Sequence, residues 1–194
     1  MPEIVRMESP LARFRLDTPA ATALGPSGVV AFERPYLGHL NLRGRLAEAG
    51  FAAAVAGVLG TALPSAANTV AVAGETIVYW LGPDEWLVVT PGAQEGEVAA
   101  ALREALRGIF AAVTEVGSGQ TVIVLRGRGV RDLLAKECPF DLHAPSFAPG
   151  ACAQTRLAKA AVLLRPLDDG AMELVVRRSF ADYLWSWLVD AAGA

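Results

Sequence analysis

The feature that most constrains the fold is an internal repeat. The tetrapeptide Leu-Arg-Gly-Arg occurs twice, at residues 42–45 and 125–128. Each copy is followed, in the same order, by a proline, an Ala-x-Thr tripeptide, a Leu-Val-Val tripeptide and an amphipathic stretch. Offsets between matching landmarks drift only from 83 to 87 residues. Small loop insertions produce such a drift, so the chain is predicted to contain a duplicated supersecondary unit.

Hydrophobic periodicity gives both repeats a similar order of elements. The first is predicted to contain a strand at 36–43, a helix at 47–59, strands at 67–72, 75–81 and 86–90, and a helix at 94–109. The second is predicted to contain a strand at 121–125, a helix at 130–136, strands at 151–157, 160–164 and 173–177, and a helix at 179–191 with Ser179 as N-cap. This order predicts an α+β fold made of two pseudo-symmetric ferredoxin-like halves.

The first 35 residues are expected to form an extended N-terminal arm, because they carry five prolines that discourage a long helix. Residues 29–32 within it can form one strand. Such an arm can wrap around its own domain or lie along a partner, and we favour the partner. Residues 36–194 are predicted to form a single domain made of two repeats, 36–110 and 115–194.

Composition suggests a chain that works within an assembly. Apolar residues make up 53% and charged residues 19%, where about 25% charged is usual. This low charge indicates a permanent partner; an alanine-rich soluble protein is the other interpretation. The net charge of −3 argues against nucleic acid or an anionic membrane as partner. No secretory signal or membrane span is visible, so we expect a cytoplasmic protein.

Few residues suggest catalysis or metal binding. The carboxylate pairs Asp84-Glu85 and Asp168-Asp169 fall in predicted turns, where acidic side chains are usually solvated. His39 and His143 are the only histidines. A cluster of His143 with Cys138, Asp141 and Cys152 matches no zinc spacing, and the two cysteines are expected to be reduced and mostly buried.

The repeated turns are the best local candidate for a ligand site. Their arginines, next to glycine and a predicted helix start, can attract an anion, although surface ion pairs are the commoner use of such residues; the set is Arg43, Arg45, Arg126, Arg128 and Arg131. Four tryptophans, Trp80, Trp86, Trp185 and Trp187, are candidates for the core or for an interface. Trp185 lies off the apolar stripe of its predicted helix, so it can face outward as an interface anchor or inward with the others.

Five segments together resemble the gamma subunit of heterotetrameric sarcosine oxidase, and the similarity covers most of the chain. They are LGHLNLRG at 37–44, WLGPDEWL at 80–87, CPFDLH at 138–143, CAQTRL at 152–157 and RRSFADYLW at 177–185. Of these, the WLGPDEW run is the most specific.

The resemblance implies a complex of alpha, beta, gamma and delta chains that oxidises sarcosine to glycine. Such a complex makes hydrogen peroxide and passes the one-carbon unit to tetrahydrofolate. It implies that FAD, FMN, NAD and zinc belong to the other chains, and that the gamma chain is a non-catalytic subunit packed chiefly on alpha. No catalytic, cofactor-binding or metal-binding residue is therefore predicted in this chain.

The fold more distantly resembles the tetrahydrofolate-binding domain of the glycine-cleavage aminomethyltransferase. This makes independent binding of tetrahydrofolate or another anion the alternative function. That family carries acidic residues on the strand expected to correspond to residues 159–165, and this segment contains none. The difference argues against one-carbon chemistry in this chain.

Overall fold

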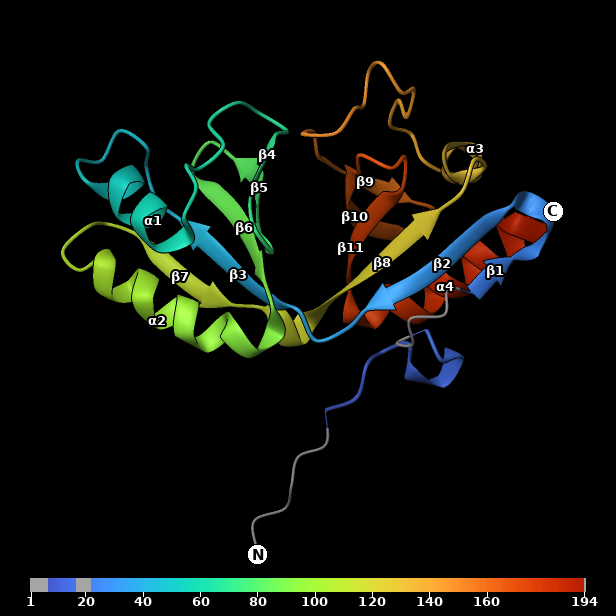
Figure 1. Cartoon of the computed structure of the whole chain (residues 1–194), viewed down its shortest axis with the longest axis horizontal. Helices are drawn as coiled ribbons and strands as arrows, with labels where there is room; N and C mark the ends of the chain where they lie inside the picture. The colour runs from blue at the N-terminus through green and yellow to red at the C-terminus, as the bar shows by residue number, and fades with distance from the viewer. Residues whose placement is uncertain (1–6, 17–21, 194) are drawn as a thin grey trace, which may run out of the picture.

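The protein consists of two β-sheets that pack face to face, with helices on the outer face of each sheet (Figure 1). This computed structural model describes residues 7–16 and 22–193. The architecture confirms an α+β fold with two ferredoxin-like halves.

The first half forms a five-stranded antiparallel sheet in the order β4-β5-β6-β3-β7. Its elements are β3 (Gly38–Arg43), α1 (Phe51–Leu59), β4 (Val70–Ala73), β5 (Thr76–Gly82), β6 (Glu85–Thr90), α2 (Glu95–Ala105) and β7 (Ala112–Glu115). Helices α1 and α2 bury their apolar sides against Leu40, Leu42 and Val88 of the sheet.

The second half forms a six-stranded antiparallel sheet in the order β1-β2-β8-β11-β10-β9. Its elements are β1 (Thr22–Leu24), β2 (Val29–Arg34), β8 (Gln120–Arg126), α3 (Val130–Ala135), β9 (Ala153–Leu157), β10 (Ala160–Pro166), β11 (Met172–Arg177) and α4 (Arg178–Gly193). Short 3-10 helices lie at Ala12–Phe14, Gly25–Ser27, Gly92–Gln94 and Gly117–Gly119.

The strand orders of the two sheets match position by position. Strands β4, β5, β6 and β3 correspond to β9, β10, β11 and β8. The next place is taken by β7 in the first half but by β2 in the second, and both pair antiparallel with their neighbour. A segment from the N-terminal end thus completes the sheet of the second repeat.

This placement shows that part of the predicted N-terminal arm belongs to the domain itself. Residues 22–34 form β1, a short 3-10 helix and β2 of the second sheet. Residues 7–16 form a strap over α4, with Leu11 and Leu16 fully buried and the Phe14 ring 5.9 Å from that of Trp185. The predicted arm also includes residues 1–6 and 17–21, which lie outside the described residues, as does residue 194.

Each repeated glycine stands where a side chain does not fit. A Cβ on Gly44 would lie 2.2 Å from the ring of Phe51, the first residue of α1. A Cβ on Gly127 would lie 2.1 Å from the carbonyl oxygen of Gly28, and Gly127 has φ +120°. Both glycines follow the end of a strand and precede a helix, as the repeat predicts.

Three helix starts differ from prediction, that of α2 by a single residue, at Glu95 instead of residue 94. Helix α1 begins at Phe51 instead of residue 47, because Gly50 adopts a left-handed conformation immediately before it. Helix α4 begins at Arg178, so Ser179 lies in its first turn and is not the N-cap. In the described part of the chain, no helix has the length and apolar character needed to cross a membrane.

Candidate functional site

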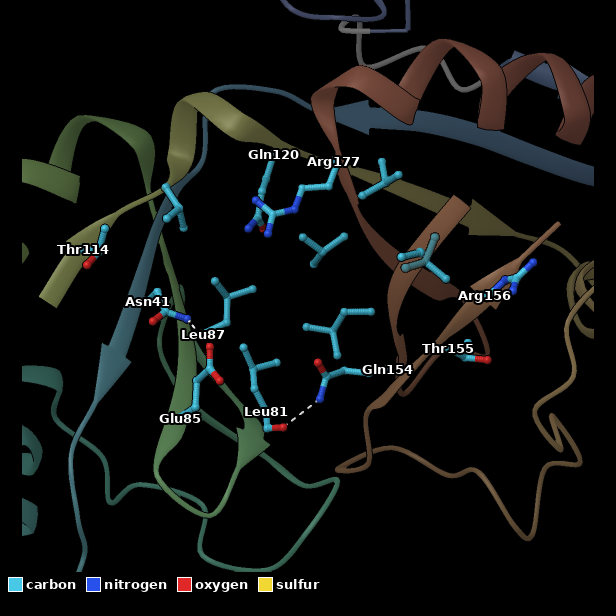
Figure 2. Close-up of a pocket in the computed structure, with 16 residues that line it drawn as sticks. Asn41, Leu81, Glu85, Leu87, Thr114, Gln120, Gln154, Thr155, Arg156 and Arg177 are labelled. Atoms are coloured by element: carbon cyan, nitrogen blue, oxygen red, sulfur yellow. Dashed lines mark hydrogen bonds between the residues drawn. The ribbon is translucent and has the colours of Figure 1, made fainter. Parts of the chain in front are cut away.

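The two sheets leave an open cleft of about 760 Å³ between their facing surfaces (Figure 2). The first sheet contributes residues of β3, β5, β6 and β7, and the second contributes residues of β8, β9, β10 and β11. A volume of this size falls within the range of about 300–1,000 Å³ that is typical of binding pockets. The cleft is therefore the main candidate site of the molecule.

The floor of the cleft is apolar and continuous with the core between the sheets. Leu87, Leu163 and Val175 are nearly fully buried there and belong to one hydrophobic cluster. They lie on strand positions that alternate with residues facing the helices, as the period of two in a strand requires. An apolar floor favours an occupant with a hydrophobic portion.

One wall carries a carboxylate that is already engaged. Glu85 Oε1 accepts a hydrogen bond of 2.7 Å from Asn41 Nδ2, and Glu85 Oε2 lies 2.9 Å from Arg43 Nη2. Glu85 is thereby held in position and its charge is balanced. It offers little to an anionic or a cationic occupant.

The opposite wall carries two arginines, Arg156 on β9 and Arg177 on β11, and both are exposed. Among residues 7–16 and 22–193, neither guanidinium makes an ion pair with a carboxylate. Gln120 stands directly across from Arg177 in the β8–β11 ladder, and Figure 2 shows the two side chains next to each other. The buried Oε1 atom of Gln120 accepts no hydrogen bond.

A side chain of β9 bridges the cleft to the first sheet. Gln154 Nε2 donates a hydrogen bond of 2.8 Å to the carbonyl oxygen of Leu81 (Figure 2). Nearby, Thr69 and Ala151 form an isolated antiparallel bridge, and Cys152 N donates to Asn68 O at 2.8 Å. These bonds fix the separation of the two sheets.

Deeper between the sheets, Glu173 of β11 is the centre of a buried polar cluster. Its carboxylate accepts hydrogen bonds from Tyr79 Oη of the first sheet, from Arg34 Nη1 at 2.8 Å and from Arg165 Nη1 at 3.4 Å. Burial raises the pKa of Tyr79 well above its usual value, and the negative charge of Glu173 raises it further. Tyr79 therefore remains a donor, and the cluster joins the sheets.

His39 is buried in the same layer and is held neutral. Burial lowers its pKa to about 4, although the hydrogen bond of 3.0 Å between Nδ1 and Leu37 O and the charge of Glu173 act in the opposite direction. Within residues 7–16 and 22–193, its Nε2 atom has no hydrogen-bond partner. The imidazole does not line the cleft.

The two carboxylate pairs lie at strand turns, as the sequence predicts. Asp84 and Glu85 lie at the β5–β6 turn near Arg43, and Asp169 lies at the β10–β11 turn, 3.3 Å from Arg126 Nε. Asp169 also accepts a hydrogen bond from Ala171 N at 3.0 Å.

The two Leu-Arg-Gly-Arg turns do not combine into a basic groove. Strands β3 and β8 run toward opposite ends of the molecule, so the turns that follow them are far apart (Figure 1). Arg43 and Arg126 make ion pairs, and Arg131 donates to the carbonyl oxygens of Leu142 and Phe147. Surface pairing is the use that the structure shows for Arg43 and Arg126; Arg45 and Arg128 lie in the same two turns.

The residues of the possible zinc cluster, Cys138, Asp141, His143 and Cys152, make other contacts. Cys138 and Cys152 are both free, and Cys152 is buried, with its Sγ 3.5 Å from Thr69 O. Burial raises the pKa of the Cys152 thiol to about 11, which disfavours the thiolate. Asp141 accepts a hydrogen bond from His143 N at 2.9 Å and is exposed. In the described ranges, no three His, Cys, Asp or Glu side chains are placed to hold a metal ion.

The four tryptophans lie in or against the hydrophobic cores. Trp86 is fully buried, with its Nε1 donating to Pro64 O at 2.9 Å, and Trp185 is buried beneath the N-terminal strap. The suggestion that Trp185 faces outward is therefore wrong. Trp80 and Trp187 are partly buried against the helix-side cores.

Sequence comparison places this chain among known subunits. Residues 43–194 match the family model described as "Sarcosine oxidase, gamma subunit family". Relatives named sarcosine oxidase subunit gamma include one from Arthrobacter sp., 36% identical over 84% of this chain and 79% of the relative. Another, from Corynebacterium sp. strain P-1, is 35% identical over 79% of this chain and 74% of the relative.

Structure comparison agrees with this assignment. A chain of the heterotetrameric sarcosine oxidase from Corynebacterium sp. U-96 superposes with a TM-score of 0.86 and 30% identity, over 97% of both chains. The glycine-cleavage aminomethyltransferase T from Bartonella henselae superposes with a TM-score of 0.64 and 13% identity, over 82% of this chain and 45% of the other. The second similarity concerns the fold alone.

Proposed function

Because the chain belongs to the sarcosine oxidase gamma subunit family, we propose that it is the non-catalytic assembly subunit of a heterotetrameric sarcosine oxidase. The complex would demethylate sarcosine oxidatively to glycine, release hydrogen peroxide and pass the one-carbon unit to tetrahydrofolate. The alpha chain would be the chief partner, with beta and delta in the same cytoplasmic complex. FAD, FMN, NAD and zinc are assigned to those other chains.

The non-catalytic role is supported by how this chain uses its buried titratable groups. Glu173 and Tyr79 are bound to each other, and two arginines neutralise the carboxylate. His39 faces the core with a lowered pKa, and Cys152 has a raised pKa. A general base or nucleophile needs to reach a substrate atom at about 3 Å. Instead, Tyr79 bonds to Glu173 and Cys152 bonds to Thr69 O between the two halves, and His39 bonds to Leu37 O.

Co-expression of the four chains, with and without this one, tests the proposal. We expect the complete set to yield a complex containing one copy of this chain, and omission to reduce recovery of the other chains as one assembly. We expect the isolated chain to show no sarcosine turnover in a hydrogen peroxide assay. Turnover by the isolated chain, or full assembly and activity without it, would contradict the proposal.

Independent binding of tetrahydrofolate or another anion is the alternative function. The arginines of the repeated turns give it little support, because Arg43 and Arg126 are ion-paired and the two turns lie far apart. Calorimetric titration of tetrahydrofolate into the isolated chain distinguishes this alternative from the assembly function. Saturable heat at micromolar ligand would support the alternative.

A further inference from the structure

The inter-sheet cleft presents an excess of positive charge on an apolar surface. Arg156 and Arg177 project from β9 and β11, the strands on either side of β10 in the second sheet, and no described carboxylate pairs with either. The carboxylate across the cleft, Glu85, is balanced by Arg43. An occupant that complements these walls carries a negative charge next to an apolar group.

The cleft also offers a hydrogen-bond acceptor that the fold leaves unused. Gln120 Oε1 is buried and receives no hydrogen bond from the described part of the chain, although a buried carbonyl normally finds a donor. It lies opposite Arg177 in the strand ladder. The position is suited to an incoming N–H group beside a carboxylate.

Edge strands border the cleft on both sides. In the described part of the chain, β9 is the last strand of one sheet and β7 the last strand of the other. Thr155 and Arg156 of β9 and Thr114 of β7 line the cleft. Extended peptides commonly bind where an exposed sheet edge adjoins pockets for alternate side chains.

From this arrangement we infer that the cleft receives an extended acidic segment of another chain of the complex. A carboxylate of that segment lies between Arg156 and Arg177, a backbone N–H donates to Gln120 Oε1, and an apolar side chain contacts Leu87 and Leu163. The inference rests on the proposed assembly function. It adds the surface and the chemistry of the partner that this surface recognises.

Photo-crosslinking in the complete complex locates the occupant. A benzoylphenylalanine introduced at Ala161, an exposed residue of the cleft wall, should crosslink to an acidic segment of one other chain, identified by mass spectrometry. The same probe at Ala53, exposed on the outer helix α1, should not label that segment. Labelling of no other chain from Ala161 would overturn the inference.

Charge reversal measures the contribution of the arginines. We expect Arg156→Glu with Arg177→Glu to weaken association with the other chains at least tenfold, and reversal of the crosslinked acidic residue to lysine to restore it. The matched control is Arg107→Glu, since Arg107 is exposed and, among the described residues, makes its ion pair with Glu104. It should associate like the wild type, and circular dichroism should show all variants folded.

The outcomes separate this inference from the assembly function. If the wild type assembles and the double variant assembles equally well, the cleft is not the docking site, while the assembly role stands. If the wild type itself fails to assemble, the proposed function is wrong. If tetrahydrofolate binds the complete complex and competes with the Ala161 crosslink, a small anion and not a chain segment occupies the cleft.

Discussion

His39 shows how one buried residue makes the stability of the molecule depend on pH. Its pKa is about 4 in the folded chain, against an ordinary value of 6.5, because burial disfavours the charged imidazolium. Between these values the unfolded chain binds a proton that the folded chain does not. Stability is therefore fully present above about pH 6.5, falls as the pH decreases toward 4, and changes no further below it through this residue.

We predict that His39→Asn reduces this pH dependence. Asparagine can still donate to Leu37 O but does not titrate. The wild type should lose about 2 kcal/mol of unfolding free energy between pH 7 and pH 5 through His39, and the variant should lack that component. Urea unfolding at both pH values measures it, with His143→Asn at an exposed position as control. An unchanged pH dependence in His39→Asn would contradict the assignment.

Glu173 provides a second prediction at the residue scale. Glu173→Ala leaves the Tyr79 hydroxyl and the guanidiniums of Arg34 and Arg165 without their shared acceptor. Breaking such a buried network is expected to cost about 3–5 kcal/mol of unfolding free energy. Glu104→Ala, which removes an exposed ion pair with Arg107, should cost less than about 1 kcal/mol. Similar losses in both variants, measured by urea unfolding, would show that the cluster does not stabilise the sheets.

The residues of the cleft form no recognisable motif along the sequence, and for this reason sequence patterns do not predict them. Asn41, Gln120, Gln154 and Arg177 lie on four strands that only the packing of two sheets brings together. In the sequence, His39 is likewise only a polar residue within a largely apolar strand. Conversely, the Arg-Gly-Arg motif is conspicuous in the sequence, but it serves turn geometry and, at Arg43 and Arg126, surface pairing.

At the scale of elements, the repeat predicted most of the helices and strands correctly because each has its own periodicity. It could not predict that strands from different parts of the chain occupy the equivalent position in the two sheets. Strand β2 completes the second sheet in the place that β7 has in the first, and no local pattern specifies which sheet an edge strand joins. The burial of Trp185 depends on the same N-terminal region, because Phe14 of the strap covers it.

The strand-to-helix turn gives a prediction for an element boundary. Gly44→Ala would place a Cβ 2.2 Å from the Phe51 ring and is expected to destabilise the fold by about 1–3 kcal/mol. Gly57→Ala, in the exposed middle of α1 with open space around its Cα, should stabilise by about 0.5–1 kcal/mol. Thermal unfolding of the two variants should shift in opposite directions. A stabilising effect at Gly44 would exclude close packing as the reason for that glycine.

For the whole molecule, the three hydrophobic cores determine how the halves unfold. Each sheet shares one core with its own helices, and a third core lies between the sheets together with the Glu173 cluster. The β4 and β9 ends are also joined by backbone bonds. Neither half can leave the other without exposing Leu87, Val89, Val124 and Val175 to water, so the halves should form one cooperative unit.

This coupling predicts a single transition even when only one half is destabilised. Leu102→Ala on α2 and Leu184→Ala on α4 each remove a fully buried side chain from a different helix-side core and should cost about 2–5 kcal/mol. Hydrogen exchange read separately in the two halves should show loss of protection in both halves for either variant, since the slowest amides exchange through global unfolding. Loss confined to the mutated half would mean that the core between the sheets is too weak to couple them, and that the repeats fold as independent domains.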